Sequence, residues 1–174
     1  MKNKPFLLFV IFLCPLLGCA QQNPDFPVSE AEQLVDTISL DFKNPWSFTF
    51  LPDGAILVTE KEGTLHHLKD GIKQDIGGLP DIYVRGQGGF LDITLHPDYA
   101  NNGWIYFSYG LSKENSRGGN TAVMRARLQD MNLSDQQVIF EATPESTKGQ
   151  HWGGRLTFDK EGFLYISVGD RGSR

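Results

Sequence analysis

Cysteine is almost missing from this sequence: of the 174 residues only Cys14 and Cys19 are cysteines, and both lie within the first twenty. The rest of the chain therefore has no thiol for a disulfide, a thiolate metal site or a cysteine nucleophile. An excess of basic residues is missing as well, because 16 Lys and Arg stand against 21 Asp and Glu and give a net charge of −5 at pH 7. We therefore expect no nucleic-acid partner, since binding to phosphates needs a basic surface.

The chain also lacks an apolar run long enough to cross a membrane. The longest run, residues 6–18, follows Lys2 and Lys4 and has the length of the apolar region of an export signal. The run leads into "LLGCA", which resembles the signal of bacterial lipoproteins, and this resemblance implies that Cys19 is lipidated and becomes the mature N-terminus. An ordinary secretory signal cleaved near Ala20 is the alternative.

We thus expect three parts along the chain. A lipoprotein-type signal peptide occupies residues 1–18, a lipidated N-terminus and polar linker occupies 19–34, and a folded domain occupies 35–174. Removal of the signal takes away two lysines and no acid, which changes the net charge from −5 to −7. With either signal the protein is expected to be exported, as a lipoprotein on the periplasmic side of a bacterial membrane or as a secreted protein.

Helical periodicity is a further absence, because no window combines a sustained 3.6-residue apolar period with helix caps. Three segments instead alternate apolar and polar residues on both sides of a turn: "WSFTFLPDGAILVTEKEGTLHHL", "LDITLHPDYANNGWIYFSYG" and "RLTFDKEGFLYISVGD". Each predicts a β-hairpin, with turns that begin near Pro52, Pro97 and Asp159. Shorter strands are expected around a turn at 69–71 and across "QDMNLSD".

We therefore predict an all-β fold, and the spacing of the turns favours a β-propeller. The three turns recur about 45 and 62 residues apart, which suits propeller blades with insertions. A propeller closes with roughly four to eight blades, and this chain supplies about three, so we expect a truncated arc of blades. A small β-sandwich of seven or eight strands is the alternative.

Four segments together resemble one known family. "NPWSFTFLPDGAILVTEKEGTL", "GQGGFLDITLHPDYANNGWIYFSY", "RARL" and "HWGGRLTFDKEGFLYISVGDRG" are similar to the soluble PQQ-dependent sugar dehydrogenases, the glucose/sorbosone or aldose sugar dehydrogenase family, from about Ile38 to Arg174. The resemblance implies a six-bladed propeller that carries PQQ and calcium and oxidises aldoses at C1 to the lactone. This chain resembles the N-terminal half, so no metal ligand is expected in it, and we expect it to be inactive alone.

The resemblance implies that His151, in "KGQHWGGRL", is the catalytic base. Oxidation of C1 removes the O1 proton while a hydride leaves the carbon, so a base that is partly neutral near pH 7 is needed, and histidine suits this task. The glycines around it leave room for a flat cofactor and a sugar. Without the resemblance, a histidine that only stabilises its loop by hydrogen bonding is the more common case.

Further site residues are expected around this base. Gln87, in a glycine-rich turn, is expected to contact both cofactor and sugar, because an amide donates and accepts hydrogen bonds. Trp152 is expected to present an aromatic face to the cofactor. Gln150 and Arg171 are expected near the substrate, although both depart from the family pattern: some relatives have an acidic residue at the first position and glutamine at the second.

Other residues are interpreted as structural, and one other function remains open. Arg155 is expected to support its loop or to pair with a carboxylate, and Asp92 to be a buried, hydrogen-bonded carboxylate on a strand. His66 and His67 are expected on opposite faces of one strand, where they cannot share a metal. The alternative function is a non-catalytic, propeller-type lipoprotein that binds a carbohydrate or a protein. The electron acceptor is not predicted.

Overall fold

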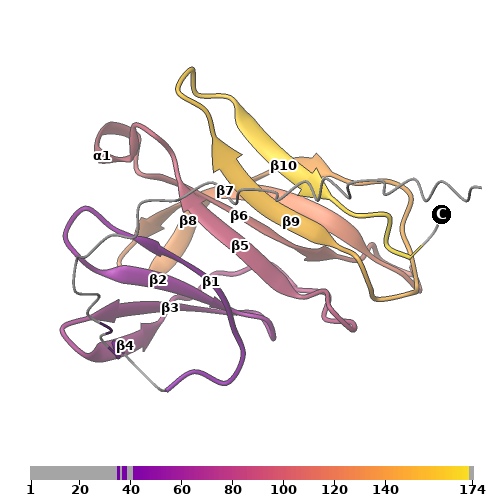
Figure 1. Ribbon diagram of the computed structural model, residues 1–174, viewed down its shortest axis with the longest axis horizontal. Helices are drawn as coiled ribbons and strands as arrows, with labels where there is room; N and C mark the ends of the chain where they lie inside the picture. The colour runs from indigo at the N-terminus through magenta and orange to yellow at the C-terminus, as the bar shows by residue number, and fades with distance from the viewer. Residues whose placement is uncertain (1–34, 36, 39–40, 173–174) are drawn as a thin grey trace, which may run out of the picture. The chain divides into compact units, whose positions relative to one another are not determined.

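The computed structural model describes residues 35, 37–38 and 41–172, and the predicted signal peptide, the linker and Cys19 lie outside the described residues. Three antiparallel sheets follow one another along the chain (Figure 1). The first contains β1 (Pro45–Phe50), β2 (Ile56–Glu60), β3 (Thr64–Lys69) and β4 (Ile72–Asp75); the second contains β5 (Phe90–Leu95), β6 (Trp104–Leu111), β7 (Asn120–Gln129) and β8 (Asn132–Glu141); the third contains β9 (Gly153–Phe158) and β10 (Leu164–Val168).

The sheet topology confirms the all-β propeller prediction. In each of the two four-stranded sheets, neighbouring strands are also neighbours in sequence, and every pairing is antiparallel. Such a four-stranded meander is the blade of a propeller. The described residues therefore form two complete blades and the first hairpin of a third, and the β-sandwich alternative is wrong.

The turns follow from local backbone chemistry. β7 and β8 are joined at Asp130 and Met131, whose φ angles of 47° and 59° are those of a two-residue hairpin turn of type I′. The turn between β5 and β6 is more structured than the sequence indicated, because it contains the single helical turn α1 (Tyr99–Asn102). Gly103 ends that turn in the left-handed region, with φ 65° and its N–H donated to Tyr99 O.

Alternation along β6 places its side chains in two separate cores. On β6, Ile105, Phe107 and Tyr109 belong to the large core between the first and second sheets, whereas Tyr106 points to the other side and packs against Leu156 of the third sheet. Burial of each large apolar side chain stabilises the fold by roughly 1.5–3 kcal/mol. The inner strands of the second sheet are therefore covered on both faces, and most residues of β6 and β7 are buried.

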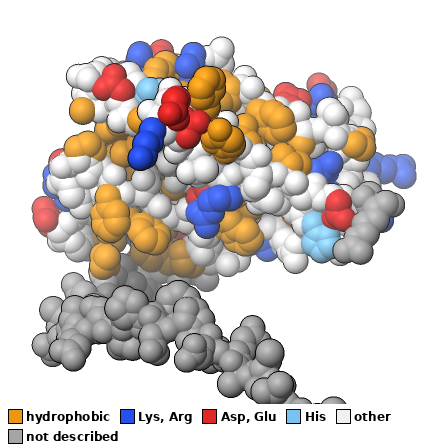
Figure 2. Space-filling model, turned by 45° about the horizontal axis from the view of Figure 1, so that its top comes forward, with side chains coloured by type: hydrophobic (Ala, Val, Ile, Leu, Met, Phe, Trp, Pro, Cys, Tyr) orange, Lys and Arg blue, Asp and Glu red, His pale blue; other side chains and the backbone are white. Residues whose placement is uncertain are grey.

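Apolar side chains remain exposed on strands at the edges of the first and third sheets. Phe48 and Phe50 on β1 are 61% and 55% exposed, and Phe163 and Tyr165, before and within β10, are 68% and 58% exposed. Figure 2 shows hydrophobic side chains at several places on one face of the molecule. No helix within residues 41–172 is long and apolar enough to cross a membrane.

Candidate active site

His151 lies in a loop that the backbone holds in an uncommon conformation. It precedes β9 by two residues and has φ 55°, a left-handed value that non-glycine residues seldom adopt. Its carbonyl oxygen accepts a hydrogen bond from Arg171 N at 3.1 Å, and its N–H donates to Gln87 Oε1 at 2.8 Å. Strained residues of this kind are concentrated at functional sites, where surrounding contacts maintain them. The side chain is 52% exposed, so a ligand can reach the imidazole.

A β-bulge interrupts the third sheet just after His151. Along most of the sheet the register pairs Leu156 with Ile166, and a one-residue shift then pairs Gly153 with Val168, where the ladder ends. Beyond it, Arg171 N donates to His151 O, and the side chain of Asp170 reaches the imidazole. Bulges are common beside active sites. Gly153 is needed at the bulge, because its φ is 73° and an added Cβ would lie 2.6 Å from Ser167 O.

Asp170, which the sequence analysis did not identify, therefore pairs with the imidazole. Its Oδ1 lies 2.7 Å from His151 Nδ1. The backbone N–H of Gly172 and then the hydrogen bond with His151 lower the pKa of Asp170, so the carboxylate is ionised at neutral pH. An ionised partner accepts a hydrogen bond and thus favours the tautomer with the proton on Nδ1. That tautomer presents an unprotonated Nε2, the form that a base requires.

Gln87 lies directly beside His151, as the sequence predicted for a shared site. It occupies the turn between Arg85 and Gly88, and its N–H donates to Gly149 O at 2.8 Å while its Oε1 accepts from His151 N. The loops before β5 and before β9 are therefore joined by two hydrogen bonds. Since Oε1 is occupied, the Nε2 donors, which have no partner among the described residues, are the groups that Gln87 offers to a ligand.

The prediction that Trp152 presents an aromatic face to the cofactor is not met. The residue is 3% exposed, and its ring packs against Tyr83, with 6.1 Å between ring centroids, and against Gly88. An added Cβ at Gly88 would lie 2.2 Å from the indole, so the ring fills the space that this glycine leaves. Trp152 therefore packs against the turn that carries Gln87, and its ring is not accessible to a cofactor.

Of the two predicted substrate contacts, that of Arg171 needs correction. Arg171 is 8% exposed, and its Nη1 donates to Gly169 O at 2.7 Å, so the guanidinium supports its own loop. Gln150 is exposed, but its amide lies against Gly172, and the imidazole is oriented by Asp170 and not from position 150. Gln150 is therefore accessible to a ligand, whereas the buried Arg171 is not.

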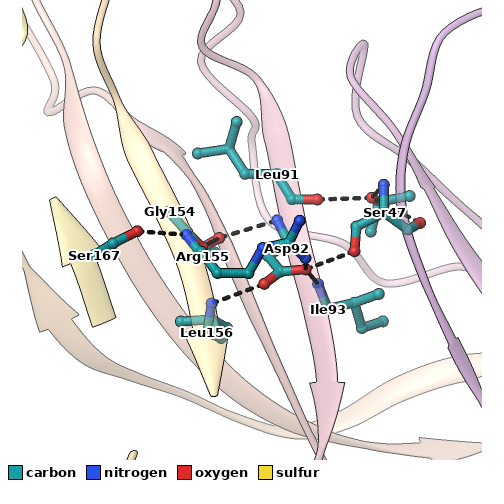
Figure 3. A network of polar contacts seen from close by, with 10 residues as sticks. Ser47, Leu91, Asp92, Ile93, Gly154, Arg155, Leu156 and Ser167 are labelled. Atoms are coloured by element: carbon teal, nitrogen blue, oxygen red, sulfur yellow. Dashed lines mark hydrogen bonds and ion pairs between the residues drawn. The ribbon is translucent and has the colours of Figure 1, made fainter. Parts of the chain in front are cut away.

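The structural roles predicted for Arg155 and Asp92 are confirmed. Asp92 is 3% exposed, and Arg155 Nη1 donates to its Oδ1 at 2.9 Å (Figure 3). Figure 3 shows the carboxylate between the strands that carry Leu156 and Ser47. It lies well inside the sheets, whereas His151 and Gln87 lie in the loops before β9 and β5.

The described site fits part of what an anionic quinone cofactor and a sugar require. The exposed imidazole has a carboxylate partner, Gln87 offers amide donors, and Arg85 and Lys148 place cationic side chains on the two loops that meet there. Two hydrogen bonds between the loop before β5 and the loop before β9 already fix the backbone beside His151. Among residues 41–172, no group of three or more His, Cys, Asp or Glu is arranged to hold a metal ion, so calcium stays a prediction.

The chain is similar in sequence to proteins of one known family. The Glucose / Sorbosone dehydrogenase family model matches residues 42–174. The chain is similar to the aldose sugar dehydrogenase YliI of Escherichia coli strain K12, with 36% identity over 169 residues that make up 94% of this chain and 44% of that protein.

Two solved structures are similar in fold. The apo form of the soluble aldose sugar dehydrogenase from Escherichia coli matches with a TM-score of 0.72 and 36% identity over 76% of this chain and 40% of that one. The PQQ-bound aldose sugar dehydrogenase from Streptomyces coelicolor matches with a TM-score of 0.69 and 26% identity over 81% of this chain and 42% of that one. The chain thus spans less than half the length of each of these three proteins.

Proposed function

The chain belongs to the glucose/sorbosone dehydrogenase family, and from this membership we propose that the full-length gene product oxidises aldose sugars at C1 to the lactone with PQQ as cofactor. The observation that carries the proposal is the exposed His151, whose Nδ1 is paired with the ionised Asp170 and whose backbone N–H is hydrogen bonded to Gln87. This arrangement supplies an oriented base at an accessible surface.

The proposed chemistry divides between the chain and the cofactor. His151 Nε2 accepts the proton from the O1 hydroxyl of the sugar, and Asp170 stabilises the imidazolium that forms through the 2.7 Å contact at Nδ1. The C1–H bond breaks with its electron pair as O1 forms a double bond to C1. The bound quinone would supply the acceptor for that hydride. A proton and a hydride leave the hemiacetal, and these are the two hydrogens that separate it from the lactone.

Gln87 has a positioning task in this proposal. Its Oε1 keeps the His151 loop in its left-handed conformation, while the Nε2 donors are left for a sugar hydroxyl or the cofactor. Arg85 and Lys148 favour an anionic cofactor on the same loops, because PQQ carries carboxylates. Calcium is proposed as a second cofactor, held by residues other than those described.

The direct test is reduction of an artificial electron acceptor by the purified full-length gene product. After addition of PQQ and calcium, we expect acceptor reduction that depends on an aldose and stops when PQQ is left out. A well-folded, monodisperse protein that binds PQQ but reduces nothing with a panel of aldoses would contradict it. That result would favour the alternative of a non-catalytic binding protein.

We also propose that a lipid on Cys19 anchors the exported domain to a membrane, on the strength of the "LLGCA" segment. In a Gram-negative host the protein is then expected in the membrane fraction, and Cys19→Ser is expected to move it to the soluble periplasmic fraction. Equal membrane binding and processing of both forms would overturn the lipoprotein assignment.

Residues 1–174 by themselves are proposed to be inactive. Phe48, Phe50, Phe163 and Tyr165 are more than half exposed, which favours association over catalysis when no further strands cover them. Aldose-dependent acceptor reduction by monodisperse protein limited to these residues would contradict this expectation.

A further inference from the structure

One buried carboxylate joins all three sheets. Asp92 on β5 accepts hydrogen bonds from Ser47 Oγ of β1 at 2.5 Å, from Leu156 N of β9 at 2.7 Å, from Arg155 Nη1 of β9 at 2.9 Å and from Ile93 N at 3.0 Å. These strands are the first strands of the three sheets. Every partner is a donor, so the site matches an ionised carboxylate, which accepts only.

A second link runs parallel to the first. Asp92 N donates to Ser108 Oγ at 3.0 Å, and Ser108 Oγ donates to the carbonyl oxygen of Gly154. Strand β9 is therefore held at three consecutive residues, Gly154, Arg155 and Leu156, although it forms no ladder with β5. The contacts cross from one blade to the next, where backbone pairing does not set the register.

The position of these contacts along the strands relates them to the site. β5 and β9 run side by side in the same direction (Figure 3). Gln87 precedes Asp92 by five residues, and His151 precedes Leu156 by five residues as well. Because the offsets are equal, a contact between Asp92 and Leu156 brings Gln87 and His151 to the same level at the ends of the two strands.

The two loops contact each other at this level. His151 N donates to Gln87 Oε1 at 2.8 Å, and Gln87 N donates to Gly149 O at 2.8 Å. A slip of one residue between the strands would move one loop past the other by about 3.3 Å, which breaks both hydrogen bonds. The loop contacts alone do not oppose such a slip well, because both loops are at the surface.

We propose that Asp92 is a positioning residue that sets the register between β5 and β9 and thereby holds Gln87 against His151. Its consequence for turnover rests on the proposed function, whereas its consequence for the two loops does not. The isosteric Asp92→Asn change tests it, because Leu156 N donates to one carboxylate oxygen and Ser47 Oγ to the other. An amide has a single oxygen, so its NH2 must face one of these donors. The matched control is Ser47→Ala, which removes a donor to the same carboxylate from β1 and leaves β9 attached.

The experiment measures amide hydrogen exchange at Gln87 and His151 in the full-length gene product, with Phe107 in the core as internal reference, and then kcat with an aldose. For Asp92→Asn we expect exchange at Gln87 and His151 to accelerate about tenfold or more relative to Phe107, and kcat to fall by a similar factor. Ser47→Ala should change each ratio less than about threefold. Unchanged exchange ratios in folded Asp92→Asn would overturn the proposal, as would equal effects of both variants.

A third variant decides the matter if Asp92→Asn does not fold. Arg155→Met removes one of the two donors that β9 offers to the Asp92 carboxylate, so faster exchange at His151 relative to Phe107 supports the proposal and an unchanged ratio overturns it. If the protein shows no dehydrogenase activity at all, the proposed function fails while the exchange ratios still decide the role of Asp92. If exchange is unchanged and activity is normal, the proposed function stands and the role of Asp92 falls.

Discussion

Two histidine–aspartate pairs among the described residues have the same separation and different surroundings. His66 Nδ1 lies 2.7 Å from Asp75 Oδ1, and His151 Nδ1 lies 2.7 Å from Asp170 Oδ1. The His66 side chain is 6% exposed, whereas that of His151 is 52% exposed. The distance within the pair therefore does not distinguish a candidate base from a structural histidine, whereas access to the ring does.

The surroundings of His66 explain its different role. It lies in the regular strand β3, paired with Val58 and Asp75, and its Nε2 faces Glu60 Oε2 at 3.4 Å. The rings of Phe42 and His66 pack edge to face. A cavity of about 380 Å³ beside them is lined by acidic and basic side chains, among them Asp41, Lys43 and Lys73. His66 thus ties β2, β3 and β4 together, whereas His151 has a strained loop and an open side.

The largest expected contrast is in turnover. In the full-length protein, His151→Ala should lower kcat by about two to four orders of magnitude, because the base is lost, while PQQ binding changes little. The matched change His66→Gln should leave kcat within about threefold, because it removes an imidazole–carboxylate pair outside the site. Steady-state kinetics at saturating cofactor make the comparison. Near-normal turnover of His151→Ala would remove that residue from its role.

A smaller contrast is expected for the carboxylate partners. Asp170→Asn should lower kcat about 10- to 100-fold, since the base is present but its tautomer and ring orientation are no longer fixed. Asp75→Asn, which alters the pair at His66, should have no comparable effect. Steady-state kinetics of both variants measure this difference. Equal kcat values for the two variants would show that the pairs are equivalent after all.

The smallest effect concerns stability around His66. Burial alone raises the pKa of Glu60, but the hydrogen bonds from Lys43 N and His66, with the charges of His66 and Lys73, outweigh it and lower the pKa below the usual 4.5. The ionised carboxylate therefore adds stability that is present above about pH 4.5 and is lost as the pH falls through the folded-state pKa.

Glu60→Gln should accordingly cost about 1–3 kcal/mol at pH 7 and less at lower pH, because the hydrogen bond from Lys43 N then has a neutral acceptor. Denaturant unfolding of both proteins at pH 7 and pH 4 measures this. A difference between the two proteins that grows on acidification would reverse the assigned sign.

The sequence predicted the sheets well because their signals are local. Alternation on both sides of Pro52, Pro97 and Asp159 identified the hairpins, and the turn residues near Asp130 identified β7 and β8. Burial of Asp92 also followed from sequence, since a carboxylate on an otherwise apolar strand needs donors. That Arg155 is one of these donors did not follow, because the sequence left the partner of Arg155 open.

The rest of the site depends on contacts between strands that no local pattern encodes. The contact between the Asp170 side chain and His151 forms beyond the end of the β9–β10 ladder, past the bulge at Gly153, where strand alternation no longer predicts which side chains meet. The glycines around position 153 were the available signal for such a bulge. Trp152 was misjudged because an aromatic residue beside a loop histidine gives no indication whether its ring turns outward or, as here, under Gly88.

The most direct test of the account is a crystal structure of the full-length protein with PQQ and an unreactive sugar analogue bound. The account predicts that His151 Nε2 lies within hydrogen-bonding reach of the sugar O1, about 2.6–3.2 Å, while Nδ1 keeps its contact with Asp170. A sugar whose O1 is held by another base, with His151 turned away or reached only through Nδ1, would contradict the central claim that exposure of Nε2 separates the two histidine–aspartate pairs.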